Sequence, residues 1–80
     1  MPILPILLPK DVVKLFEKNG YQTKGQAGSH KKLSNGIQTI IVPIHNKPLK
    51  VGTLKSIIRQ ANITDEEFLK LYSKTKQSKF

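Results

Sequence analysis

The sequence predicts an α+β domain in which a three-stranded antiparallel meander is covered by helices on one face. Three observations predict this class. Apolar residues recur at helical spacing towards both ends of the chain, β-branched and apolar residues cluster in its middle, and an Asn-Gly pair separates two extended segments. The expected order is therefore α-β-β-β-α-α in a single domain of 80 residues.

The first half of the chain predicts one helix and two short strands. Residues 10–19 form the helix, because apolar residues line one side of it and Asn19-Gly20 supplies a left-handed stop. We expect a strand over 21–24, a glycine-containing turn over 25–28 and a second strand over 29–34.

The Asn35-Gly36 pair is the strongest hairpin signal in the sequence and favours a type I′ turn. A third strand over 37–44 follows, with Pro43 at a frayed end or an edge position. If Asn35 and Gly36 are the two turn residues, the numbers of opposing residues sum to 71. That register places His30 opposite Ile41.

The second half predicts two helices. Apolar residues at helical spacing indicate a helix over 51–61, and the capping box Thr64 to Glu67 opens a third helix that buries Phe68, Leu69 and Tyr72. We therefore divide the chain into an N-terminal extension, a domain and a basic, frayed tail. These are residues 1–9, 10–72 and 73–80. The proline-broken extension could pack on the sheet edge, contact a partner or be disordered.

Charge and composition limit the possible functions. Fourteen basic and five acidic side chains give a net charge of +9, and residues 18–64 contain no acid at all. Such a surface attracts polyanions, although a plain solvated lysine surface is the alternative. The absence of cysteine and the presence of only two histidines argue against a metal site, and a chain this short cannot enclose a large cofactor. No segment is long enough to span a membrane, so we expect a cytoplasmic protein with no metal and no small-molecule cofactor.

Alternation along the second strand separates its side chains into two groups. Leu33 is the inward residue, which puts Ser29 and Lys31 on its side, while His30 and Lys32 point to the other face. Because all helices pack on one face, that other face stays open to solvent. An exposed imidazole beside a lysine can meet a phosphodiester there.

The run Gly28-Ser29-His30 resembles the signature of the HicA toxins, small RNA-cleaving partners of HicB antitoxins. Further similarity lies in Lys18 to Tyr21, Val42 to His45, Lys50 to Ala61 and Thr64 to Leu71, so that it covers about residues 10–72. The resemblance implies a double-stranded-RNA-binding-like fold and metal-independent cleavage of mRNA. It also implies a catalytic role for His30 and a HicB-like antitoxin that covers this histidine. The chain departs from the family in having Gln26-Ala27 before the motif, where a basic residue is common, and Lys31-Lys32 after it.

The chemistry can also be argued from the residues. RNA carries its own nucleophile, the ribose 2′-OH, so a cleaving protein needs proton transfer near neutral pH and stabilisation of phosphate charge. Histidine suits the first task, and lysines with the backbone N–H groups near Gly28 suit the second. We therefore expect His30 to be the general acid or base. The expected RNA-binding residues are Lys24, Gly28, Ser29, Lys31, Lys32, Lys50 and Lys55.

His45 is the only other candidate for proton transfer. In the register that sums to 71 it lies opposite Gln26, about 13 Å from His30 along the strand. We therefore expect His45 to be structural, capping its loop or lining an interface. Three hypotheses follow from the sequence: a ribonuclease toxin, a non-catalytic RNA-binding module of the same fold, and a protein whose basic face serves an acidic partner.

Overall fold

The computed structural model describes residues 3–77, without the side chains of 76 and 77. Its elements follow the predicted order α-β-β-β-α-α, and the strands form one antiparallel sheet in the order β1-β2-β3. The bounds are α1 Pro9–Glu17, β1 Gln22–Ala27, β2 His30–Ser34, β3 Thr39–Pro43, α2 Val51–Gln60 and α3 Asp65–Gln77. The α+β meander is therefore confirmed.

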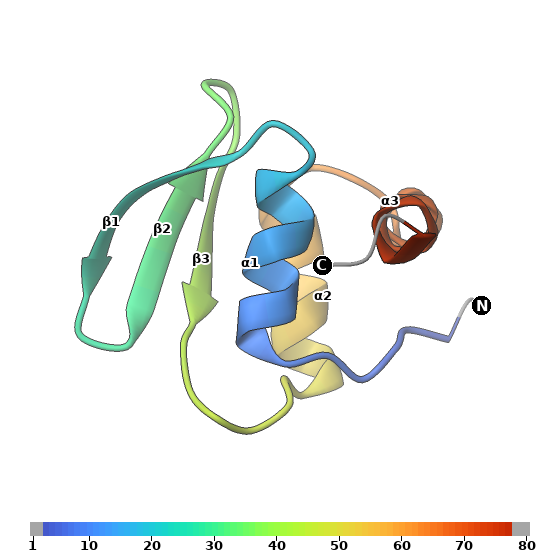
Figure 1. The fold of residues 1–80 in the computed structure, drawn as a ribbon, viewed down its shortest axis with the longest axis horizontal. Helices are drawn as coiled ribbons and strands as arrows, with labels where there is room; N and C mark the ends of the chain where they lie inside the picture. The colour runs from blue at the N-terminus through green and yellow to red at the C-terminus, as the bar shows by residue number, and fades with distance from the viewer. Residues whose placement is uncertain (1–2, 78–80) are drawn as a thin grey trace.

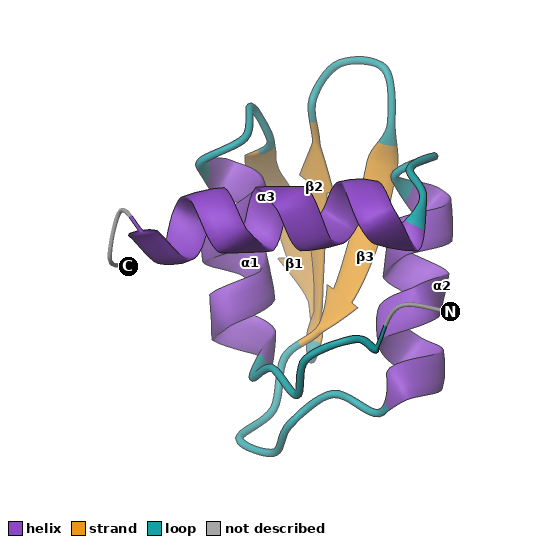
Figure 2. Cartoon of the chain, turned by 90° about the vertical axis from the view of Figure 1, so that its right-hand side faces the viewer, coloured by secondary structure: helices purple, strands orange, loops and turns teal. Residues whose placement is uncertain are grey.

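The elements form three layers, with the sheet on one side, α1 and α2 in the middle and α3 beyond them (Figure 1). Figure 2 shows α3 lying across both middle helices, on the side away from the sheet. All three helices thus lie on the same side of the sheet, as expected. Its other face carries no helix in the described part of the chain.

The first helix spans Pro9–Glu17, so it begins one residue before the predicted range of 10–19 and ends two residues before its predicted end. Pro9 occupies the first turn, where its missing N–H costs nothing, and Gly20 adopts a φ of +96° after the last turn. The buried Phe16 meets Tyr21 edge to face, with ring centroids 5.0 Å apart. This burial raises the pKa of Tyr21, because it disfavours the charged phenolate.

The third helix is longer than predicted. Its capping box is confirmed, since the N–H of Thr64 donates to Glu67 Oε1 (2.8 Å) and the N–H of Glu67 donates to Thr64 Oγ1 (3.0 Å). The prediction of a frayed tail from residue 73 was wrong, because the helix continues to Gln77. Thr75 is buried and accepts a hydrogen bond from Asn19 Nδ2 (3.3 Å), which ties α3 to the end of α1. The rest of the predicted tail, 78–80, lies outside the described residues.

The described part of the N-terminal extension packs on the core. Leu4 and Leu7 are buried, whereas Ile3 and Ile6 face solvent. The carbonyl of Leu7 also accepts a hydrogen bond from the N–H of Leu49 (2.8 Å), in the loop before α2. This segment therefore belongs to the folded unit, which answers the question that the sequence left open.

The first hairpin differs from the prediction in length. β1 runs to Ala27, so Gly25 to Ala27 are strand residues and the turn shrinks to Gly28 and Ser29. A bulge at Lys24 absorbs the extra residue, since Thr23 pairs with Leu33 while Gly25 pairs with Lys32.

The second hairpin turns one residue later than predicted. The N–H of Asn35 donates to the carbonyl of Gln38 (3.2 Å), and Asn35 Oδ1 accepts from the N–H groups of Ile37 (2.9 Å) and Gln38 (2.7 Å). Gly36 has a φ of +94° but Asn35 does not have a positive φ, which excludes a type I′ turn. Opposing residues in β2 and β3 consequently sum to 73 instead of 71, and His30 pairs with Pro43 rather than Ile41.

Side chains from every layer except the outer face of the sheet meet in one core. Leu33, Ile40, Leu54 and Phe68 are fully buried, and burial of a side chain of this size contributes about 1.5–3 kcal/mol. The edge of β3 is partly closed by α2, because the N–H of Ile41 donates to Gln60 Oε1 (2.7 Å).

The two ends of the sheet differ in the turns, loops and helix ends that lie beside them, and we call them the loop end and the motif end. The loop end holds residues 35–38 and the C-terminal ends of α1 and α2. The motif end holds the turn at Gly28-Ser29, the loop 44–50 and the N-terminal ends of both helices (Figure 1). The N-termini of two helices thus point to the same end of the sheet, and each carries the positive pole of its helix dipole.

Candidate functional site

The outer face of the sheet is the face turned away from the helices. Strand pairing and alternation from the buried Leu33 define it, and they place His30 and Lys32 there, as the alternation in the sequence predicts. The residues of this face are Gln22, Gly25, Ala27, His30, Lys32, Ser34, Thr39, Ile41 and Pro43. None of them is acidic, so the face carries only neutral and cationic side chains.

His30 has small neighbours on one side. It pairs with Ala27 of β1 and Pro43 of β3, and Lys32 pairs with Gly25 and Ile41. Because the residue of β1 opposite His30 is Ala27, β1 places only a methyl group directly beside the imidazole. Both His30 and Lys32 are exposed, so a sugar–phosphate backbone can approach them from the β1 side.

The two other predicted lysines near the motif, Lys24 and Lys31, lie on different faces of the sheet. Lys24 is exposed at the bulge, and its Nζ donates to Gln22 Oε1 (3.5 Å), which places both side chains on the same side as Lys32. Lys31 lies on the inward face opposite Val42 and is half-buried. Lys24 therefore joins the outer face, whereas Lys31 does not.

Gly28 and Ser29 form the tight turn that begins β2. Gly28 has a φ of +59°, a conformation that costs a residue with a side chain about 1–2 kcal/mol. The carbonyl of Gly28 accepts from Gln26 Nε2 (3.1 Å), and the carbonyl of Ser29 accepts from the N–H of Ile44. The glycine in the motif thus has a structural reason, since the turn that presents His30 needs its left-handed backbone.

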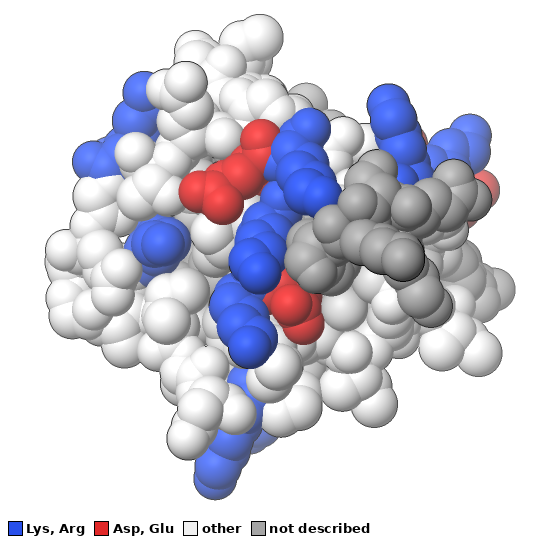
Figure 3. Space-filling model, in the orientation of Figure 1, with Lys and Arg blue, Asp and Glu red and all other residues white. Residues whose placement is uncertain are grey.

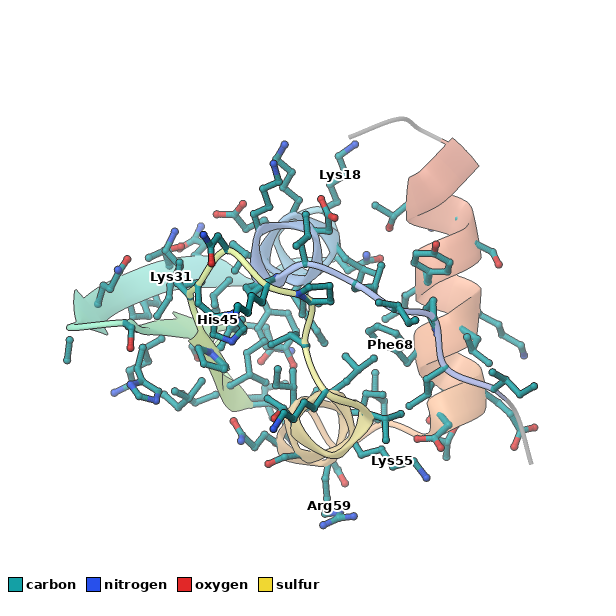
Figure 4. The ribbon with its side chains drawn as sticks, turned by 90° about the horizontal axis from the view of Figure 1, so that it is seen from below. Lys18, Lys31, His45, Lys55, Arg59 and Phe68 are labelled. Atoms are coloured by element: carbon teal, nitrogen blue, oxygen red, sulfur yellow. The ribbon has the colours of Figure 1, made fainter. Side chains whose placement is uncertain are left out.

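The two predicted lysines of the second helix have different surroundings. Lys50 is the exposed N-cap residue of α2 and lies at the motif end. Lys55 is half-buried, and its Nζ lies 3.7 Å from Asp65 Oδ2 at the start of α3. Figure 4 shows Lys55 projecting on the side of α2 that is turned away from the sheet. Only Lys50 is therefore brought to the same end of the molecule as His30.

His45 lies closer to His30 than the predicted register allows. The N–H of Ile44 bonds to the carbonyl of Ser29, so the pairing continues one residue past Pro43, and His45 follows directly beside the turn at Gly28-Ser29. His45 also caps its loop, as predicted, because its Nδ1 accepts from the N–H of Lys47 (3.3 Å). The proximity of His45 to His30 is the feature that the sequence did not predict.

The signal that could have revealed this neighbourhood is Pro43. In a hairpin whose turn residues are 35 and 36, position 43 faces β2 with its N–H, which proline lacks. In the observed register that position points its nitrogen away from β2, and no ladder bond is lost. The proline therefore favours the turn centred one residue later.

Two hollows flank His45 at the motif end. One has a volume of about 440 Å³ and is lined by Pro43, His45, Lys47, Pro48, Lys50 and Thr53. The other has a volume of about 320 Å³ and is lined by Leu8, Lys10, Ile44, His45 and Asn46. Lys10, Lys47 and Lys50 thus line the hollows beside the exposed imidazole of His45. This arrangement suits an anionic ligand.

A second cationic surface runs along α1. Lys10, Lys14 and Lys18 are exposed and spaced four residues apart, which places them on one face of the helix. Figure 3 shows a column of basic side chains down the middle of this view, with acidic side chains beside it. Because acids accompany these lysines and are absent from the strands, the motif end and outer face are the more strongly cationic surface.

Residues 3–77 contain no group of three or more His, Cys, Asp or Glu side chains placed to hold a metal ion. Among the same residues, no helix has the length and apolar character needed to cross a membrane.

The fold and the site define a class, namely small α+β proteins that present a histidine on an open, acid-free sheet face. Comparison with known families narrows this class. The family model described as the HicA toxin of bacterial toxin–antitoxin systems matches residues 9–63, and the chain belongs to that family. It is thus a toxin of a toxin–antitoxin system, and its partner is an antitoxin. A search of curated proteins gave no match.

Proposed function

We propose that this chain is a metal-independent endoribonuclease that cuts mRNA, with His30 as a general acid or base. The observation that carries this proposal is the exposure of His30 on the acid-free outer face, beside Lys32 and two small residues of β1. A side chain in this position is open to a polyanion, and histidine is the residue that most often transfers protons in general acid–base catalysis. Membership of the toxin family supports the same conclusion.

The reaction needs no group beyond those of the chain and the RNA. The ribose 2′-OH attacks the adjacent phosphorus, so the protein has to move protons and stabilise charge on the phosphate oxygens. His30 serves the first purpose, and positioned general acids or bases of this kind accelerate reactions about 10²–10⁴-fold. Lys24 and Lys32, with the backbone N–H groups of the Gly28-Ser29 turn, serve the second.

The proposed RNA path follows the outer face to the motif end. Lys24, Lys32 and the Gly28-Ser29 turn border it, and Lys50 extends it to the start of α2. Lys55 is left out because it pairs with Asp65 behind α2. Lys31 reaches this path only from the opposite side of β2.

The same surface accounts for control by an antitoxin. A HicB-like partner that covers His30 would close the outer face and exclude RNA from it. Its contact surface should be acidic, because like charges placed opposite each other are unfavourable. We expect the toxin to act in the cytoplasm, where its mRNA substrate is found.

One experiment tests the proposal. Purified protein and its His30→Ala variant are incubated with RNA in the presence of EDTA, and cleavage is followed on denaturing gels. Cleavage by the parent alone, with unchanged folding of the variant, is the expected result. RNA retained without cleavage by both proteins would overturn the proposal in favour of a non-catalytic RNA-binding module. Absence of RNA binding at low salt would instead leave a surface that serves only an acidic partner.

A further inference from the structure

The proposed mechanism is incomplete with one histidine. Cleavage requires a proton to leave the 2′-OH and another to reach the 5′ oxygen of the departing nucleotide. A single imidazole does both only in succession. The described residues contain one other histidine, His45, and its place in the sheet decides whether it can take part.

The register observed up to Pro43, extended by the bond from the N–H of Ile44 to the carbonyl of Ser29, places the two histidines on the same face. His30 pairs with Pro43, and His45 follows two residues later, so alternation carries His45 to the side of Pro43. The intervening Ile44 packs against the core, which confirms the alternation. The two histidines are thus diagonal neighbours across adjacent strands, a relation in which backbones lie about 7–8 Å apart. The imidazoles can reach a single phosphodiester from its two sides.

The surroundings of His45 fit a phosphate. Lys47 and Lys50 share one hollow with it, and Lys10 shares the other. The charged side chains that line these two hollows with His45 are therefore all cations, and the acid of the first turn of α1, Asp11, is not among the lining residues. Its Nδ1 accepts the N–H of Lys47, which leaves Nε2 as the atom open to substrate. On the side of His30, the charged neighbours are Lys32 and Lys24.

We propose that His45 is a second catalytic residue, which forms with His30 an acid–base pair for RNA cleavage. The neutral imidazole of one histidine takes the proton of the 2′-OH as that oxygen bonds to phosphorus. The protonated imidazole of the other gives its proton to the 5′ oxygen as the bond from phosphorus to that oxygen breaks. The products are a 2′,3′-cyclic phosphate and a free 5′-OH, and exchange with water returns both imidazoles to their starting states. This inference rests on the proposed ribonuclease activity.

Two variants of His45 separate catalysis from loop capping. His45→Ala removes both the imidazole and the acceptor for the N–H of Lys47. His45→Asn keeps an acceptor that can bond the N–H two residues on, but it cannot exchange a proton near neutral pH. We expect both variants to lose about 10²–10⁴-fold in cleavage rate while still binding RNA and unfolding at the parent's midpoint. Cleavage by His45→Asn at the parent rate would show that His45 only caps its loop, and would overturn the inference.

The pH profile gives a second measure. Two histidines acting as acid and base produce a bell-shaped dependence of cleavage on pH, so the residual activity of His45→Asn should lose one limb of the bell. An unchanged bell in this variant would contradict the pair. A parent that does not cleave RNA under any of these conditions would refute the proposed function itself, which is a separate outcome.

A substrate with sulfur in place of the 5′ bridging oxygen assigns the two roles. A thiolate leaves without receiving a proton, so this substrate restores cleavage to the variant that lacks the acid and not to the variant that lacks the base. We expect rescue of either His45→Asn or His30→Ala, by about 10²-fold or more. Rescue of neither, with the parent active, would show that no histidine protonates the leaving group.

Discussion

The loop end and the motif end belong to the same sheet and use their polar groups in opposite ways. At the loop end, Asn35 Oδ1 binds two backbone N–H groups, and Ser34 Oγ accepts the N–H of Gly36. At the motif end, His30, His45 and Lys50 are exposed, and the residues that precede α1 and α2 make no side-chain cap. The loop end thus uses these polar side chains to bind its own backbone. The motif end uses Gln26 and one nitrogen of His45 in this way, but it leaves His30, Lys50 and the other nitrogen of His45 open to a ligand.

The two ends also differ in electrostatics. The N-termini of α1 and α2 lie at the motif end together with Lys10, Lys47 and Lys50, while the carbonyl ends of both helices lie at the loop end. Each N-terminus is equivalent to roughly half a positive charge. The sheet therefore has one end that attracts phosphates and one that does not, although both are built from the same strands.

Moving the histidine from the motif end to the loop end should have the largest effect on RNA cleavage. Ser34 lies on the outer face at the loop end, two residues beyond Lys32. The double variant His30→Ala, Ser34→His keeps an imidazole on the same face, and we expect it to remain about 10²–10⁴-fold below the parent in RNA cleavage. The reason is that position 34 has neither His45 nor the helix N-termini nearby. Recovery of cleavage beyond the level of His30→Ala alone would show that the motif end is not special.

Each end of the sheet has one turn glycine, so the same substitution can be compared at the motif end and at the loop end. Gly28 and Gly36 both have positive φ angles, +59° and +94°, and a Cβ added to either meets no atom within 4 Å. Alanine at each position should therefore lower the free energy of unfolding by about 1–2 kcal/mol through the backbone alone, as measured in urea. Only Gly28→Ala should also reduce cleavage under conditions in which both variants stay folded. Equal loss of cleavage in the two would mean that the turn of the motif has no local role.

The smallest expected effect is on the salt dependence of RNA binding, and two lysines of the α2 region test it. Lys50→Ala should reduce the dependence of RNA affinity on salt, with the slope of log affinity against log salt falling by about 0.7 for one lost contact to a single strand. Lys55→Ala is the control, since its ammonium group pairs with Asp65 away from the sheet. Binding isotherms at several salt concentrations measure both slopes. A larger change for Lys55→Ala would place the RNA on the far side of α2.

Much of the fold could be predicted because burial decides it. The inward positions Leu33, Ile40 and Val42 must face the helices, so the face that carries His30 followed from alternation alone. The capping box of α3 and the stop at Gly20 were likewise local features with clear residue preferences. Each of these predictions depended on neighbours in sequence.

The register between β2 and β3 could not be predicted in this way. A shift of two residues keeps Ile40 and Val42 inward, so the core does not distinguish a sum of 71 from one of 73. The choice depends on hydrogen bonds of Asn35, on the bond from Ile41 to Gln60 and on the missing N–H of Pro43. The relation between His30 and His45 follows from that register, which is why the second histidine was placed too far away.

The bond between Ile41 and Gln60 has a consequence for self-association. An uncovered edge strand offers its N–H groups to a strand of another molecule, and proteins avoid this by covering or interrupting such edges. Here an amide from α2 occupies the N–H of Ile41, Pro43 offers none, and the opposite edge is interrupted by the bulge at Lys24. Both borders of the sheet are thus poor templates for strand addition, so copies of the toxin can accumulate without joining edge to edge.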